Sequence, residues 1–223
     1  LALSPTVDVG DSRLSISRST FRQSTATSRG GAIRYDGSQL EIYTTTFEDN
    51  AVTTDDSSNA RGGAIVISGN EAVAETRILV DNSIFKNNTA VGLGAALFVQ
   101  DIHSFNISSS RFIDNEASGV VYVENVLFPG SLRVDRSHFI RNIGSALLVR
   151  DLLHASIVKS SFVRNQVSIP AGDESSFPNQ LGGGAALCYI SNGASLLDVS
   201  QSGFFRNRAE GPGGAILIVD SAM

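Results

Sequence analysis

Cysteine is almost absent from this 223-residue chain, which contains a single one, Cys188. One cysteine excludes an internal disulfide and a cysteine-rich zinc site, and it leaves the redox compartment open. No apolar run approaches the roughly 18 residues of a membrane-spanning helix. The first five residues, Leu-Ala-Leu-Ser-Pro, also lack the basic and long apolar regions of a signal peptide. We therefore expect no direct membrane insertion.

Charged residues are scarce as well, at 17% of the chain. Seventeen Lys and Arg against 22 Asp and Glu give a net charge of −5, and the sequence has no Lys/Arg cluster. Such a cluster is the usual electrostatic footprint of a nucleic-acid-binding protein, so nucleic acid is not an expected partner. Apolar residues make up 42% of the chain, which is enough for a packed core.

What the sequence does contain is one pattern that recurs seven times. Its most visible part is a Phe followed three residues later by an Asn, and six of the seven copies keep both residues. The copies are Phe47/Asn50, Phe85/Asn88, Phe112/Asn115, Phe139/Asn142, Phe162/Asn165 and Phe204/Asn207, with Phe21/Ser24 as a degenerate first copy. A recurring pattern of this kind indicates a repeat architecture.

The positions before each Phe are equally regular. An apolar residue lies seven and usually five positions upstream, as Leu132 and Val134 do before Phe139, and this alternation is typical of a strand. Two positions before the Phe there is always a small hydroxyl residue, namely Ser19, Thr45, Ser83, Ser110, Ser137, Ser160 or Ser202. We expect a bend at this position that turns the hydroxyl inside.

Downstream of the Asn, a cluster of small residues leads into a second apolar alternation, as in Gly62-Gly63-Ala64-Ile65. Gly and Ala let the backbone turn, or approach another backbone closely, where a larger side chain would clash. The Phe residues at 85, 112 and 139 are 27 positions apart. A repeat of this length that contains only short strands excludes leucine-rich and helical solenoids.

One such coil cannot bury its inward apolar side chains, whereas coils stacked about 4.8 Å apart bury them in columns. We therefore predict an all-β fold, a single-stranded parallel β-helix of about seven coils. The Phe residues should form one internal stack, and the Asn residues a ladder at one corner. We expect residues 1–223 to form one domain within a longer solenoid, because residues 213–219 form a core strand with no polar cap after it.

The paired motifs resemble the Gly-Gly-Ala-Ile/Leu/Val and Phe-x-x-Asn repeats of chlamydial polymorphic outer-membrane proteins, within the wider pectin-lyase-like superfamily. The resemblance covers almost the whole chain and implies a right-handed parallel β-helix. Members of that family are surface-exposed adhesins or autotransporter passengers, which implies an extracellular or cell-surface location.

The same superfamily contains polysaccharide lyases and hydrolases, whose acid/base chemistry needs carboxyl groups that face one groove. The only Asp pair, Asp55-Asp56, lies in an insertion over residues 53–61 with the composition of a solvated loop. Asp49 and Asp114 share a position that holds Asn or Arg in other coils, which indicates surface neutralisation. We therefore expect no catalytic residue and no cofactor.

The positions of the other polar residues within the repeat do not bring them together at one site. His103, His138 and His154 are scattered, so no metal site is expected. Asn87 and Asn106 begin the two N-glycosylation tripeptides. The longest insertion, residues 166–181, should leave the solenoid at the same corner as residues 53–61, and such loops often carry binding specificity.

These patterns favour a non-enzymatic structural or adhesive segment of a large surface or extracellular protein. Its partners would be further coils of the parent chain, other surface proteins, or carbohydrate. One alternative is a polysaccharide-processing β-helix, lyase- or hydrolase-like, which carboxylates from neighbouring coils in one groove would favour. The other is a carbohydrate-binding module, which exposed aromatic residues along a groove would favour. Tyr43, outward by phase, is the obvious aromatic candidate.

Overall fold

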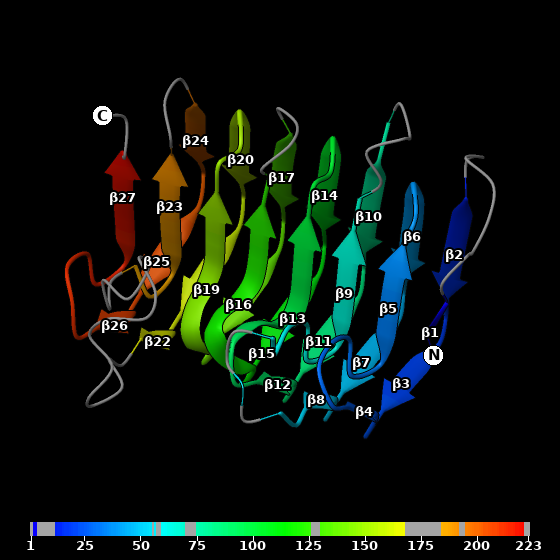
Figure 1. Cartoon of the computed structure of the whole chain (residues 1–223). Coiled ribbons are helices and arrows are strands. Elements are labelled where there is room, and N and C mark those ends of the chain that lie inside the picture. Colours follow the sequence, from blue (N-terminus) through cyan, green and yellow to red (C-terminus); the bar gives the residue numbers. More distant parts are fainter. Residues whose placement is uncertain are drawn as a thin grey trace.

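The chain winds into a coil of parallel strands that stack along a rod, from the blue N-terminal end to the red C-terminal end in Figure 1. The computed structural model describes residues 2–3, 12–54, 56, 59–69, 75–125, 130–167, 184–191 and 195–220. Every regular element in these residues is a β-strand, so none of them forms a helix that could cross a membrane. The predicted all-β parallel β-helix is confirmed.

Three sheets run along the rod, and each takes one strand or a pair of short strands from every coil. The first sheet contains β2 (Arg13–Ser17), β6 (Gln39–Tyr43), β10 (Arg77–Asp81), β14 (Ser104–Ser108), β17 (Ser131–Asp135), β20 (His154–Val158) and β24 (Leu196–Ser200). The second sheet contains β3 (Thr20–Arg22), β7 (Thr46–Glu48), β11 (Ile84–Lys86), β15 (Arg111–Ile113), β18 (His138–Ile140), β21 (Ser161–Val163) and β25 (Gly203–Phe205).

The third sheet has two ladders that are joined by two long strands, each of which belongs to both. The short ladder contains β4 (Thr25–Ala26), β8 (Ala51–Val52), β12 (Thr89–Ala90), β22 (Gln166–Val167) and β26 (Arg208–Ala209). The other ladder contains β1 (Ala2–Leu3), β5 (Ile33–Asp36), β9 (Ile65–Ser68), β13 (Leu93–Gln100), β23 (Leu187–Ser191) and β27 (Ile216–Asp220). The strands β16 (Glu116–Glu124) and β19 (Ile143–Arg150) belong to both ladders.

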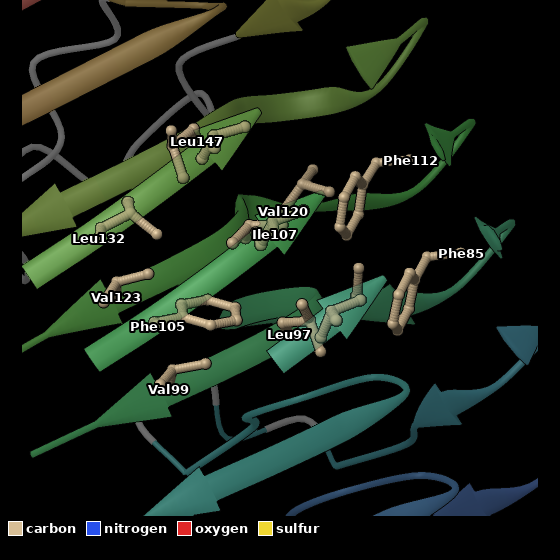
Figure 2. Packing of buried hydrophobic residues seen from close by; sticks show 14 of the residues in the cluster. Phe85, Leu97, Val99, Phe105, Ile107, Phe112, Val120, Val123, Leu132 and Leu147 are labelled. Carbon is tan, nitrogen blue, oxygen red and sulfur yellow. The ribbon is translucent and has the colours of Figure 1, made fainter. Parts of the chain in front are cut away.

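The core is a set of side-chain columns inside the coil. One column is a stack of Phe rings whose centroids are 4.6–5.0 Å apart and whose planes are nearly parallel. Figure 2 shows Phe85 and Phe112 in this stack, near inward side chains such as Leu97 and Ile107. Burial of such columns is the main favourable contribution to folding, since each coil covers the apolar surface of the next. The stack contains Phe21, Phe47, Phe85, Phe112, Phe139, Phe162 and Phe204.

Each coil turns at two corners that share one backbone device. At both corners, a residue with a positive φ between 46° and 56° precedes the residue of the repeat that turns inward, a Ser or Thr at one corner and an Asn in six of seven coils at the other. At the hydroxyl corner, between the first and second sheets, these residues are Arg18, Thr44, Asn82, Ser109, Arg136, Lys159 and Gln201. At the asparagine corner, between the second and third sheets, they are Gln23, Asp49, Asn87, Asp114, Arg141, Arg164 and Arg206. None is glycine, although this conformation costs energy for any residue with a Cβ.

The asparagine corner is a continuous ladder of side-chain amides, which Asn115 illustrates. Its Oδ1 accepts hydrogen bonds from the backbone N–H and the Nδ2 of Asn88, both at 3.0 Å. Its Nδ2 donates to the carbonyl oxygen of Phe85 at 3.0 Å and to Oδ1 of Asn142 at 3.1 Å. The amide of Asn115 therefore uses all of its hydrogen-bonding capacity while fully buried.

The ladder continues through Asn165, where the sequence spacing departs from the regular step of 27 residues. Oδ1 of Asn165 accepts a hydrogen bond of 2.9 Å from Nδ2 of Asn142, which lies 23 positions earlier. Nδ2 of Asn165 donates to the carbonyl oxygen of Phe139 and to Oδ1 of Asn207, 42 positions later, both at 3.0 Å. Asn165 is fully buried, whereas Asn207 is half-buried. The column thus keeps its bonds although the coils on either side of Asn165 differ in length.

The hydroxyl corner has fewer bonds between coils. Oγ of Ser110 donates to the carbonyl oxygen of Ser108 in its own coil at 2.7 Å, and it accepts the backbone N–H of Ser83 at 3.1 Å. Each hydroxyl from Ser83 to Ser202 accepts the N–H of the preceding coil in the same way. The hydroxyl is turned inside, where it caps the bend.

The paired glycines before the third sheet have two different roles. Gly62 has a φ of +66°, which favours a residue without a Cβ. Gly63 needs space instead, because a Cβ there would overlap the carbonyl oxygens of Thr89 and Ala95 in the next coil. The small residues thus allow both the turn and the close approach of backbones.

From β9 to β23, the central column on the outer face of the third sheet is apolar and buried, a feature that the sequence patterns did not predict. Its outer apolar cluster consists of Val66, Phe98, Tyr122, Leu148, Cys188 and Ile190, each at most 7% exposed. Phe98 and Tyr122 stack at 5.1 Å, and the Arg61 guanidinium lies 4.8 Å from the centroid of the Phe98 ring. Burial raises the pKa of the Cys188 thiol to about 11, so the thiol stays protonated at neutral pH.

Candidate ligand-binding surface

The asparagines of the repeat are structural, because they point into the coil and their amides bond to neighbouring coils. Five of the six are fully buried, namely Asn50, Asn88, Asn115, Asn142 and Asn165. The sixth, Asn207, is half-buried, and its Oδ1 accepts the backbone N–H of Asn165 at 2.9 Å. These side chains are engaged inside the rod, so a ligand must be held by outward residues instead.

The acidic residues singled out in the sequence do not form a catalytic pair in the described residues. Asp55 lies outside the described residues. Asp56 is exposed, and its carboxylate accepts a hydrogen bond of 2.6 Å from the side chain of Asn59 in the same insertion. This contact is that of a surface turn.

Asp49 and Asp114 lie in one outward column at the asparagine corner, and both are neutralised by neighbours. Both oxygens of Asp114 accept hydrogen bonds from Arg141 of the next coil, at 2.8 and 2.7 Å. Asp49 accepts a hydrogen bond from Asn87 at 3.2 Å and lies 3.5 Å from the Arg22 guanidinium. These contacts fit surface neutralisation.

The three histidines lie in different surroundings. Nδ1 of His103 accepts the backbone N–H of Thr76, His138 is exposed and shares a hydrogen bond of 2.7 Å with Ser161, and His154 begins β20. Within the described parts of the chain, no group of three His, Cys, Asp or Glu side chains is placed to hold a metal ion.

The glycosylation candidates both point outward. Asn87 is exposed at the asparagine corner, and Asn106 is half-buried on the outer face of the first sheet. Sugar attachment at either residue stays a prediction. Both insertions begin after equivalent strands, β8 and β22, of the short ladder, and residues 168–181 lie outside the described residues.

The structure does bring together two carboxylates and an arginine that phase analysis of the sequence overlooked. Glu124 pairs in register with Arg150, whose Nη1 lies 3.4 Å from Glu124 Oε1 and whose Nε lies 3.3 Å from Asp151 Oδ2. The neighbouring Tyr122 phenol has a raised pKa because it is buried, and the Glu124 carboxylate raises it further. The signal in the sequence is that Glu124 and Arg150 occupy the same position of consecutive repeats.

Both carboxylates of this pair contact the same cation. The Glu124 and Asp151 side chains are only 17% and 16% exposed, and both contact Arg150. Asp151 Oδ1 is buried and has no hydrogen-bond partner among the described residues. An arginine that contacts two carboxylates suits an ion-paired brace at the ends of β16 and β19.

A second polar surface, which we call the cationic face, covers the C-terminal half of the outer side of the second sheet. It consists of the outward residues of β15, β18, β21 and β25 and of the corner residues beside them. The cationic members are Arg111, Arg136, Arg141, Lys159, Arg164 and Arg206, all exposed, together with exposed His138, and the one acidic corner residue of the face is Asp114. Phe112, Phe139 and Phe162 point inward on the same strands, which directs the flanking residues outward.

Most cations of this face have no acidic partner. Asp114 pairs with Arg141, and Asp135 lies 3.1 Å from Arg136. The other four cations, Arg111, Lys159, Arg164 and Arg206, form no ion pair within the described residues. A shallow open depression at the hydroxyl corner of the face is lined by Ser109, Arg111, Arg136, His138 and Ile140.

An aliphatic strip runs between the charged columns of the cationic face. It consists of the aliphatic side chains of Ile113, Ile140 and Val163, and the aromatic ring of Phe205 continues it; these four residues follow the inward Phe in four successive coils. The first three are half-buried, and Phe205 is 59% exposed. The surface is therefore amphipathic, with an apolar centre and positive charge on both sides.

A family model for the right-handed β-helix region matches residues 6–222. The chain belongs to the right-handed β-helix family. Curated proteins and solved structures give no significant match. Family membership establishes the coil and its handedness, while the surface of this β-helix must be interpreted from its own residues.

The cationic face of this β-helix was not predicted, because the arginines at the position of Asp114 were interpreted as surface neutralisation and the other cations are far apart in the sequence. They gather in space because Arg136 and Lys159 occupy one position of consecutive repeats, and Arg141, Arg164 and Arg206 another. An alignment of the repeats that scored charge at each position would have shown that positive charge prevails in both columns in the C-terminal coils. Guanidinium groups can donate two parallel hydrogen bonds to a carboxylate or sulfate, so this face is suited to hold an anion.

Proposed function

We propose that this β-helix is a non-enzymatic structural and adhesive segment of a large surface or extracellular protein. The observation that carries the proposal is the distribution of unpaired charge. The carboxylates at 114 and 124 are each engaged by an arginine, whereas four cations of one broad face are unpaired among the described residues. A surface of this kind can hold an anionic ligand through ion pairs.

The interior supports a scaffolding role. Its polar ladders form hydrogen bonds between coils, and its Phe rings pack from coil to coil. The result is a rod that can hold neighbouring domains apart and display a long surface. The resemblance of the repeats to those of surface-exposed adhesins supports the extracellular or cell-surface location.

The proposal is tested by looking for both turnover and attachment. We expect the chain to release no reducing ends or unsaturated products from pectin, polygalacturonate or alginate, and to retain cells or matrix when it coats a surface. Labelling of intact cells by an antibody should detect the parent protein outside. Reproducible cleavage that is lost in Asp55→Asn/Asp56→Asn would overturn the proposal.

A polysaccharide-processing enzyme is the second candidate, because Glu124 and Asp151 meet from neighbouring coils. The test is the pair Glu124→Gln and Asp151→Asn. Cleavage that requires both carboxylates would establish the enzyme and refute the adhesive scaffold. Their shared contact with Arg150 and their small exposure favour a structural brace instead.

A further inference from the structure

We propose that the cationic face binds a linear acidic polysaccharide lying along the axis of the rod, with its carboxylate or sulfate groups against the arginine columns. This inference rests on the proposed adhesive function and names the ligand class. It concerns the second sheet, and it does not involve the carboxylates of the third sheet.

The first argument is the periodicity of the charges. Successive coils are separated by the spacing of the Phe rings, 4.6–5.0 Å, so outward side chains at one position repeat at this interval. An extended chain of pyranose sugars advances by about one coil spacing for each sugar. A polymer with an acidic group on each sugar, or on alternate sugars, can therefore meet one coil after another in register.

The second argument is the arrangement across the face. Lys159 at the hydroxyl corner and Arg164 at the asparagine corner flank β21, and Val163 of the aliphatic strip lies beside Arg164. The C–H faces of sugar rings can cover the aliphatic strip while their acidic substituents reach the cations on both sides. Several weak contacts along one polymer combine into a useful affinity.

The third argument is the contrast with the rest of the surface. The chain carries a net charge of −5, so the cationic face is a positive region on an acidic protein. Such a distribution repels a polyanion from the other surfaces and guides it to one face.

Two other polyanions fit the face less well. Single-stranded nucleic acid is held by stacking on several aromatic side chains, and the residues of the cationic face include a single aromatic ring besides His138, that of Phe205. Anionic membranes are usually held by several protruding aromatic and aliphatic side chains, whereas Ile113, Ile140 and Val163 are half-buried between the charges and Phe205 alone in the strip is exposed.

The experiment measures binding of the full chain to polygalacturonate, heparin and neutral dextran by titration calorimetry. We expect binding to at least one of the two acidic polymers and none to dextran. The affinity should fall as salt is raised, because bound cations release the counterions of the polymer. Preference for one acidic polymer distinguishes carboxylate from sulfate recognition.

The decisive variant is Arg111→Gln/Arg164→Asn, and the matched control is Arg77→Gln/Arg18→Asn. Each pair removes one positive charge from a strand and one from a positive-φ corner, but Arg77 and Arg18 lie outside the cationic face. We expect a loss of affinity of at least tenfold for the first pair and less than twofold for the control. An unchanged circular dichroism spectrum and a cooperative thermal transition no lower than that of the parent chain establish that both variants are folded.

Equal losses in the two variants, or no binding of either acidic polymer, would refute the inference. Tighter binding to a single-stranded oligonucleotide or to phosphatidylserine vesicles, lost in the same variant, would refute the polysaccharide assignment. Cleavage of a bound polymer would refute the proposed non-enzymatic function. Absence of both binding and cleavage would refute the ligand assignment alone, and attachment by another surface would still support the adhesive function.

Discussion

The two corners of each coil have the same backbone geometry but different bonds between coils. Ser110 and Asn115 are both fully buried, and each follows a residue with positive φ. The Ser110 hydroxyl accepts a hydrogen bond from one N–H of a neighbouring coil, and it donates its own hydrogen bond within its coil. The Asn115 amide bonds the coils on both of its sides. The backbone device thus sets the shape, and the side chain that follows it sets how firmly the coils are joined.

The largest effect is expected at Phe112, which lies on β15 between the two corners. We expect Phe112→Ala to lower the free energy of unfolding by about 3–5 kcal/mol, because burial is lost and a cavity is left in the stack. Urea unfolding followed by circular dichroism measures the change. The control is Ile113→Ala on the outward side of the same strand, which should cost much less, and equal losses would contradict the assigned inward column.

The asparagine corner should show the next largest effect. Asn115→Leu removes the acceptor of the buried Asn88 N–H and the donor to the Phe85 carbonyl oxygen. We expect a loss of about 1–3 kcal/mol, since buried polar groups are left unpaired. Faster hydrogen exchange of the Asn88 amide would locate the effect at this corner. A change near zero would mean that solvent reaches the ladder.

The hydroxyl corner should be affected less. Ser110→Ala leaves one backbone donor, the N–H of Ser83, without its acceptor. We expect a loss of about 1 kcal/mol, at the low end of the range for an unpaired buried group. A larger loss of stability for Ser110→Ala than for Asn115→Leu in the same urea titration would contradict the conclusion that the asparagine corner joins the coils more firmly.

The smallest effect is expected at the positive-φ residues, and it should be similar at both corners. Lys159→Asn and Arg164→Asn should raise stability by up to about 0.5 kcal/mol, because Asn tolerates the left-handed region better than most residues. Lys159→Val and Arg164→Val should each lower stability by about 1–2 kcal/mol, because a β-branched residue tolerates the left-handed region poorly. Thermal unfolding of the four variants measures this, and a stable Lys159→Val chain would contradict the backbone argument.

Much of the interior could be predicted from the sequence because inward residues obey the period of the coil. Phe112 and Asn115 recur at one phase, and a residue that recurs once per coil must form a column when coils stack. The hydroxyl of Ser110 followed from the same reasoning. Asn165 joins its column despite uneven spacing, because the insertion after it begins beyond the asparagine corner and leaves the Phe-x-x-Asn part of each coil unchanged.

The outer features could not be predicted in this way. Ile65, Val66 and Ile67 are all buried, and a strand buried on both faces gives no alternation from which to identify the outer side. The positive φ at Arg136 and Lys159 could not be predicted either, because neither residue is a glycine, the residue that usually marks this conformation in a sequence. The cationic face depends on charges that recur in only some coils, and they become a surface only after the register is known.

The unequal lengths of the coils have a mechanical consequence. Ladder bonds join residues that are 23, 26, 27, 38 or 42 positions apart, although every coil advances the rod by a similar step. A load that pulls the two ends of the chain apart would open the rod one coil at a time, since each coil is held mainly by its neighbours. A 27-residue coil would release roughly 90 Å of slack, and a 42-residue coil roughly half as much again. The insertions thus store extra length in a rod of short pitch, and under tension that length would be released in unequal steps.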